Sequence, residues 1–165
     1  MPHHRSATVR RPLGCAIVTV SDTRTPADDE SGAAIRRALD GAGHRVISAT
    51  IVRDEAEEIR GAVCGSADSA DVDVVLVTGG TGIAARDVTV ESLADLWDKQ
   101  LPGFGEIFRS LSFADIGPAA FLSRATAGVI AGTFVAVLPG SPAACDLAMT
   151  RLLLPQLPHV VDLLA

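Results

Sequence analysis

The sequence predicts an α/β protein, a single domain with a three-layer α/β/α architecture and a mostly parallel, doubly wound sheet. Short apolar runs rich in Val and Ile alternate with helical patterns along the first half of the chain. These runs are apolar on both faces, as in parallel strands covered by helices. No linker, low-complexity tract or internal repeat interrupts the 165 residues. We therefore expect one domain over residues 13–165, preceded by a flexible segment at 1–12.

The first half of the chain predicts two strand and helix pairs followed by a third strand. Strands are expected at 15–20, 46–52 and 72–77, and helices at 31–39 and 55–63. In the first helix the apolar residues recur at helical spacing, and a Gly-Ala-Gly sequence follows as a C-terminal cap. Parallel strands joined through helices have right-handed connections, which gives the doubly wound arrangement.

The second half predicts further helices around a strand pair. Helices are expected at 90–99, 103–111 and 143–154, the last of them ending before Pro155. A strand followed by a turn is expected within 119–128, and another strand at 133–138. The apolar stretch at 152–164 fits packing on the sheet, with a subunit interface as the alternative.

Charge and composition exclude several classes of protein. The net charge is −6, and the basic residues are scattered along the chain rather than gathered in a stripe, which disfavours nucleic-acid binding. No segment approaches the roughly 20 apolar residues of a membrane helix, so a cytoplasmic location is expected. Cys15, Cys64 and Cys145 are odd in number and far apart, which predicts buried free thiols.

Three loops should meet at one edge of the predicted sheet. In an open α/β sheet, ligands bind beyond the carboxyl ends of the strands, where the connecting loops converge. The polar or glycine-rich segments at 21–23, 78–82 and 139–142 each follow a predicted strand. We therefore expect them to face one cleft.

The loop Thr78-Gly79-Gly80-Thr81-Gly82 suits a phosphate. Its glycines allow a close approach of the backbone and present successive N–H groups, while its threonines add hydroxyl donors. It matches neither the Walker A motif, which needs a Lys, nor GxGxxG. The alternative is a tight turn in which the glycines only satisfy backbone geometry.

Two aspartates near this loop could hold Mg²⁺, an ion that is usually carried by one or two carboxylates together with substrate phosphates. Asp87 lies five residues after Gly82, and Asp54 follows the second predicted strand. For both residues the alternative is an N-cap of the following helix, in which the same oxygens would bind backbone N–H groups, and for Asp54 the residues alone favour this alternative.

Five sequence segments together resemble the MoaB/MogA family of molybdenum cofactor biosynthesis proteins, and the MoaB branch more than the MogA branch. They are TVSDTRT, TGGTGIAARDVTVES, GFGEIFRSLSF, SRATAG and LPGSPAA, in this order between about residues 17 and 159. The resemblance implies a three-layer α/β/α domain assembled as a homotrimer or homohexamer. It also implies an activity in which Mg²⁺ and ATP serve to adenylylate molybdopterin at its terminal phosphate, with release of pyrophosphate.

The resemblance implies site residues as well. It makes Asp54 and Asp87 catalytic and metal-binding residues. It implies a role in substrate binding for a larger set of residues, with Ser110 as an alternative to Ser112: Ser21, Asp22, Thr78, Gly79, Gly80, Thr81, Gly82, Ser112, Gly140, Ser141 and Pro142.

Two other functions are compatible with the same residues. The cleft could bind molybdopterin or its precursor without catalysis, in a carrier protein that delivers it to other molybdenum cofactor biosynthesis proteins. An oligomeric scaffold is a third possibility, but it leaves the acidic cleft without a purpose. Release of pyrophosphate from ATP distinguishes the enzyme from the carrier.

Overall fold

A computed structural model describes residues 11–165. Its six-stranded sheet has the order β2-β1-β3-β6-β5-β4. The first four of these strands are parallel neighbours, whereas β5 is antiparallel to both β6 and β4. The predicted single α/β domain with a mostly parallel sheet is thus confirmed. The strands are β1 (Gly14–Val20), β2 (Arg45–Val52), β3 (Val74–Thr78), β4 (Lys99–Gln100), β5 (Thr126–Ile130) and β6 (Thr133–Leu138).

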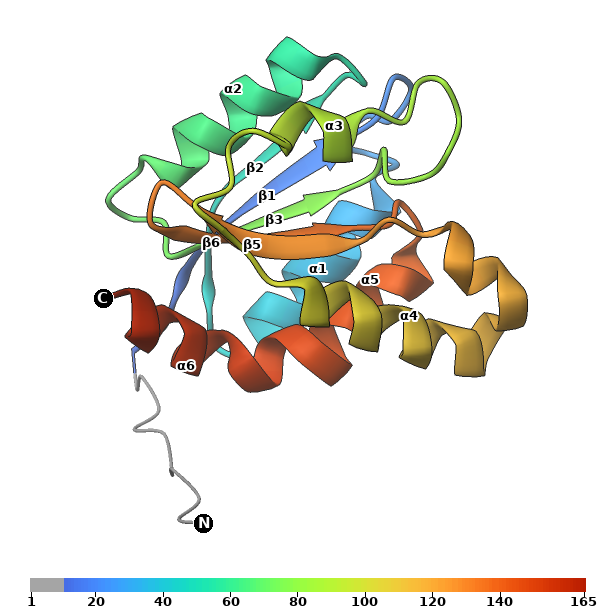
Figure 1. The fold of residues 1–165 in the computed structure, drawn as a ribbon. Coiled ribbons are helices and arrows are strands. Elements are labelled where there is room, and N and C mark those ends of the chain that lie inside the picture. The colour runs from blue at the N-terminus through green and yellow to red at the C-terminus, as the bar shows by residue number, and fades with distance from the viewer. Residues whose placement is uncertain (1–10) are drawn as a thin grey trace.

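Helices cover both faces of the sheet (Figure 1). Side chains alternate along β1, so that Cys15 and Ile17 join the core on one face while Ala16 and Val18 join the core on the other. This two-sided burial explains why the strand is apolar throughout. One face carries α1 (Glu30–Gly41), α4 (Pro102–Ile116), α5 (Pro142–Ala148) and α6 (Leu154–Leu164); the other carries α2 (Ala56–Ala67) and α3 (Thr89–Leu93).

The helix predicted at 90–99 is wrong beyond Leu93. The segment that follows pairs with β5 instead: the amide of Asp98 donates to the carbonyl of Val129, and that of Leu101 to Ala127. Gly128 allows Trp97 to lie against this strand, since a Cβ at Gly128 would be 2.7 Å from the indole ring. Tertiary pairing therefore overrides the local helical pattern.

The strand expected within 119–128 is displaced toward the C-terminus. A 3₁₀ helix, η1 (Gly117–Leu122), precedes β5, and β5 and β6 form a hairpin. Its turn is made by Ala131 and Gly132, both with positive φ (50° and 76°). This conformation matches the twist of a two-residue hairpin, but an Ala at its first position gives a weak sequence signal.

The last helix does not end before Pro155, so this prediction is also wrong. A π-helical segment, η2 (Met149–Leu153), joins α5 to α6, and Pro155 lies in the first turn of α6. The helical backbone continues from η2 into α6, and the π-helical turn just before Pro155 accommodates a residue that has no N–H to donate. Leu153, Leu157 and Val161 are buried against the sheet, as expected for core packing.

The prediction of buried free thiols holds for two of the three cysteines. Cys15 and Cys145 are buried, Cys64 is half-buried, and all three are free thiols. Burial raises the pKa of Cys15 to about 12 and that of Cys145 to about 11, so both stay protonated near neutral pH. Across residues 11–165, no helix has the length and apolar character needed to cross a membrane.

Most of the predicted flexible segment, residues 1–10, lies outside the described residues. Arg11 donates to both carboxylate oxygens of Asp73, at 2.9 and 2.7 Å, and the amide of Gly14 donates to the same carboxylate at 2.8 Å. The guanidinium and this amide hold the pKa of Asp73 below its ordinary value. Asp73 directly precedes β3, so these bonds attach the start of β1 to the start of β3.

We expect Asp73→Asn to lower the free energy of unfolding by about 1 kcal/mol at pH 7, because charge-assisted bonds are lost while one amide oxygen can still accept from Gly14. A carboxyl whose pKa is depressed by folding stabilises the fold above its unfolded pKa of about 3.9 and ceases to do so as the pH falls through the folded value. Urea unfolding from pH 7 to pH 2 should therefore show the two proteins converging below about pH 4. A difference that is constant with pH would contradict this account.

Candidate functional site

A cavity of about 300 Å³ lies where the loops after β1, β2, β3 and β6 meet the start of α1. This is the edge at which the carboxyl ends of the parallel strands converge. The structure therefore brings together the three loops that the sequence predicts to face one cleft. The predicted residues that line the cavity are Ser21, Asp22, Asp54, Thr78, Gly79, Gly80, Asp87 and Gly140.

Five predicted residues do not line this cavity. Thr81 and Gly82 continue the glycine loop beyond it, and Ser141 and Pro142 begin α5 next to Gly140. The hydroxyl oxygen of Ser141 accepts from the amide of Ala144 and so caps α5. Ser112 is buried on α4, and the alternative, Ser110, is exposed on the same helix; neither lines the cavity.

The glycine loop follows β3 with two residues in the left-handed region, Gly79 (φ 103°) and Gly80 (φ 69°). A Cβ at Gly79 would lie 2.3 Å from the carbonyl oxygen of Val20, and one at Gly80 would lie 2.1 Å from Oγ1 of Thr89. Sterics thus require glycine at both positions. The tight-turn interpretation therefore explains Gly79 and Gly80, and such a turn can also bind a ligand.

The amides of this loop are available to a ligand. Gly79 donates its N–H to the carbonyl of Leu138 at 3.0 Å. In contrast, the N–H groups of Gly80, Thr81 and Gly82 donate to no acceptor within residues 11–165. Successive backbone N–H groups without partners form the kind of concavity that binds anions.

Asp87 is held by its own loop and does not cap a helix. Its Oδ2 accepts from the amide of Ala84 at 3.0 Å, while the N-cap of α3 is Val88, which makes no side-chain cap. The capping alternative is therefore wrong for Asp87. Gly82 packs over the carboxylate, since a Cβ there would be 2.6 Å from Oδ2. Oδ1 accepts no hydrogen bond from the described residues, which leaves it free for a cation.

Asp54 does not cap a helix either. The N-cap of α2 is Glu55, without a side-chain bond, and the Asp54 amide donates to Oδ1 of Asp22 at 3.1 Å. Partial burial raises the pKa of Asp54, and the negative charges of Asp22 and Asp87 add to this effect. The carboxylates of three separate loops thus repel one another at one place, a repulsion that a divalent cation would relieve.

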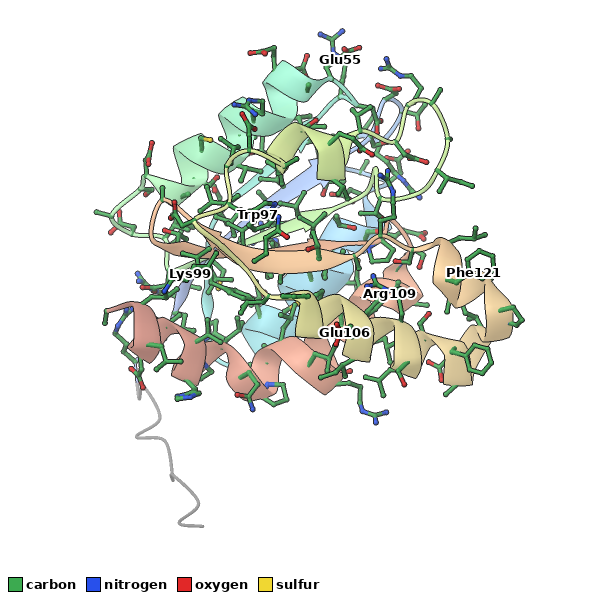
Figure 2. All side chains as sticks on the ribbon, viewed as in Figure 1. Glu55, Trp97, Lys99, Glu106, Arg109 and Phe121 are labelled. Atoms are coloured by element: carbon green, nitrogen blue, oxygen red, sulfur yellow. The ribbon has the colours of Figure 1, made fainter. Side chains whose placement is uncertain are left out.

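Arg86 was missed by the sequence reasoning, although it immediately precedes Asp87. Its guanidinium donates to both carboxylate oxygens of Asp22, at 3.0 and 2.9 Å, and to Glu55 at 3.0 Å. Hydrogen bonding to Arg86 lowers the pKa of Asp22. Glu55 lies at the outer rim of this end of the sheet (Figure 2). Arg86 therefore ties the glycine loop to the loops after β1 and β2.

The start of α1 also contributes to the site through Asp29 and through Ser31, of which the sequence reasoning missed Ser31. Oγ of Ser31 donates to the carbonyl of Gly140 at 2.6 Å. Asp29 is the N-cap of α1, accepting from the amide of Gly32, and its other carboxylate oxygen accepts from Oγ1 of Thr19 at 2.7 Å. The signal available in the sequence was the run of three acids, Asp28, Asp29 and Glu30, directly before the first predicted helix.

The donor set fits Mg²⁺ with phosphate ligands better than it fits a metal site built from protein alone. Asp54 and Asp87 face the same cavity. Among residues 11–165, however, no group of three or more His, Cys, Asp or Glu side chains is arranged to hold a metal ion. Two carboxylates completed by waters and substrate phosphates are typical of Mg²⁺ in phosphoryl-transfer sites.

Known proteins that are similar to this chain point to one family. The family described as "Probable molybdopterin binding domain" matches residues 16–159. Molybdenum cofactor biosynthesis protein B of Halalkalibacterium halodurans is 53% identical over 148 residues, which cover 89% of this chain and 87% of that protein. The chain belongs to the MoaB family.

Solved structures show how closely the fold follows that family. A crystal structure of a molybdenum cofactor biosynthesis protein B has a TM-score of 0.91 and 48% identity, covering 93% of this chain and 96% of the other. A MogA structure has a TM-score of 0.82 at 30% identity, covering 92% and 99%. The greater similarity to MoaB confirms the branch expected from the sequence motifs.

Proposed function

We propose that this MoaB family member binds molybdopterin in the cavity and adenylylates its terminal phosphate with Mg-ATP, releasing pyrophosphate. The observation that carries the proposal is the meeting, in one cavity, of Asp54, Asp87 and a glycine loop with unpaired amides. The family description and the names of the relatives support the pterin as ligand.

Each part of the site has a role in this reaction. The amides of the glycine loop bind the pterin phosphate and orient one of its oxygens toward the α-phosphorus of ATP. The new P–O bond forms at that phosphorus as the bond to pyrophosphate breaks, so that pyrophosphate leaves. Such transfers require alignment and neutralisation of charge rather than covalent catalysis by the protein.

Asp54 and Asp87 are the residues that would hold Mg²⁺ in this site. When bound, the ion neutralises charge on the nucleotide phosphates. Arg86 offsets part of the negative charge of Asp22 through its paired hydrogen bonds. Asp22 in turn holds the amide of Asp54 in place.

Titration calorimetry of the purified protein tests this proposal. We expect molybdopterin to bind without nucleotide, and ATP to bind only when Mg²⁺ is present. Binding of molybdopterin without any pyrophosphate release would favour the carrier function. The partners of such a carrier would be other molybdenum cofactor biosynthesis proteins. Absence of molybdopterin binding would contradict both functions.

We also propose that the chain assembles as a homotrimer or homohexamer in the cytoplasm. Large apolar side chains are exposed on α4 and η1, among them Phe113 (60%), Ile116 (60%) and Phe121 (76%). Phe121 projects from η1 away from the sheet (Figure 2). Grouped exposed apolar residues mark interaction surfaces. Size-exclusion chromatography with light scattering should give a trimer or hexamer, and a monomer would contradict this part of the proposal.

A further inference from the structure

We infer that Arg124 is a positioning residue that shapes the glycine loop into a cradle for a phosphate group, an inference that rests on the proposed function. Arg124 lies before β5, 42 residues from Gly82 in sequence. Its Nη2 donates to the carbonyls of Gly82 at 2.6 Å and Asp87 at 3.1 Å, and its Nε donates to Gly82 at 3.1 Å and to Thr81 at 3.3 Å. One guanidinium thus holds three carbonyls of the segment between β3 and α3, two of them at the end of the glycine loop.

These bonds set the direction of the loop amides. In a trans peptide the carbonyl of one residue and the N–H of the next point to opposite sides. Because the carbonyls of Thr81 and Gly82 point toward Arg124, the N–H groups of Gly82 and Ile83 point to the other side of the loop. Arg124 lines surface hollows outside the cavity and is absent from the cavity lining. Arg124 therefore acts on a ligand in the cavity through the loop backbone and not by direct contact.

The backbone of Arg124 strengthens this attachment. Its N–H donates to the carbonyl of Thr81 at 3.2 Å. The side chain is 32% exposed, and its Nη1 contacts the carboxylate of Glu91, which is 55% exposed. The contact with Glu91 balances charge at the surface, whereas the contacts with the three carbonyls fix the backbone.

A second arginine supports the segment that carries Arg124. Arg109 extends from α4 toward the residues that lead into β5 (Figure 2). Its Nη1 donates to the carbonyls of Ser123 at 3.3 Å and Ala125 at 3.0 Å. Gly105 makes room for this contact, because a Cβ there would be 2.6 Å from both the Ala125 carbonyl oxygen and Nη2 of Arg109. Arg109 of α4 thus holds the backbone on either side of Arg124, and Arg124 in turn holds the glycine loop.

Variants of Arg124 test the inference through a readout that does not require activity. Three backbone amides report on the conformation of the loop. The N–H of Ala84 donates to Oδ2 of Asp87, and the N–H of Asp87 donates to the carbonyl of Ala84. The N–H of Thr89 donates to the carbonyl of Gly80. In Arg124→Lys and Arg124→Gln we expect these amides to exchange hydrogen about tenfold faster, since neither side chain reproduces the planar set of donors. Amides of β3 should keep their protection. Glu91→Gln is the matched control and should behave like the wild type.

Binding measurements complete the test. With molybdopterin as the probe, the Kd should rise about tenfold in Arg124→Lys and stay within about twofold in Glu91→Gln. Three outcomes would each overturn the inference. Hydrogen exchange of the loop amides could be unchanged in both Arg124 variants, exchange could be faster throughout the chain, or both variants could lose cooperative unfolding. If the wild type itself fails to bind molybdopterin, the proposed function fails, and the exchange data alone decide whether Arg124 positions the loop.

Discussion

Asp87→Asn is expected to slow molybdopterin adenylylation by at least about 10²-fold, the scale of loss seen when one electrostatic group is removed from an active site. The substitution removes the negative charge that would hold the cation and preserves the shape of the side chain. An Asn oxygen can still accept from the amide of Ala84, as Oδ2 does at 3.0 Å. The loop should therefore keep its form, and only the charge should be lost.

Molybdopterin binding distinguishes this effect from a disordered site. We expect the Kd for molybdopterin in Asp87→Asn to stay within about threefold of the wild-type value, because the loop amides proposed to bind the phosphate are unchanged. Asp95→Asn is a suitable control, since Asp95 is 72% exposed and pairs with Arg60 away from the cavity. Full adenylylation activity in Asp87→Asn would refute the role assigned to this residue.

Gly79→Ala is expected to destabilise the fold by about 3 kcal/mol or more, combining left-handed backbone strain with overpacking. The new Cβ would lie 2.3 Å from the carbonyl oxygen of Val20, a backbone atom at the buried end of β1 that cannot turn aside. The change can be measured as the free energy of unfolding in urea.

Gly43→Ala is the matched control for this prediction. Gly43 has a similar positive φ of 80°, but a Cβ there meets nothing within 4 Å. Gly43→Ala should lower the free energy of unfolding by the backbone strain alone, about 1–2 kcal/mol. Equal losses in the two variants would show that the close approach to Val20 has no energetic weight.

The sequence pattern predicted the parts of the fold in which local preference and burial agree. The strands β1, β3 and β6 are apolar on both faces and lie inside the sheet. Their loops converge because parallel strands end at the same edge, so the segments at 21–23, 78–82 and 139–142 could be placed in one cleft from the sequence pattern, whereas Asp54 was assigned to the site by the family resemblance.

The remaining features depend on contacts between distant segments. The short strand β4 forms only because β5 offers it a partner, and η2 allows the chain to continue past Pro155. Arg124 acts on a loop that lies more than 40 residues earlier, and this relation has no periodic pattern in sequence. Ser112 was assigned from a motif, and it is the packing of α4 that buries it away from the cavity.

The measurement that tests the central claim most directly is pyrophosphate release by the purified wild-type protein given molybdopterin, ATP and Mg²⁺. The account predicts release that requires all three and that yields one adenylylated molybdopterin for each pyrophosphate. Omitting Mg²⁺ or substituting Asp87→Asn should abolish it. Tight binding of molybdopterin with no pyrophosphate formed under these conditions would contradict the account and leave a carrier protein.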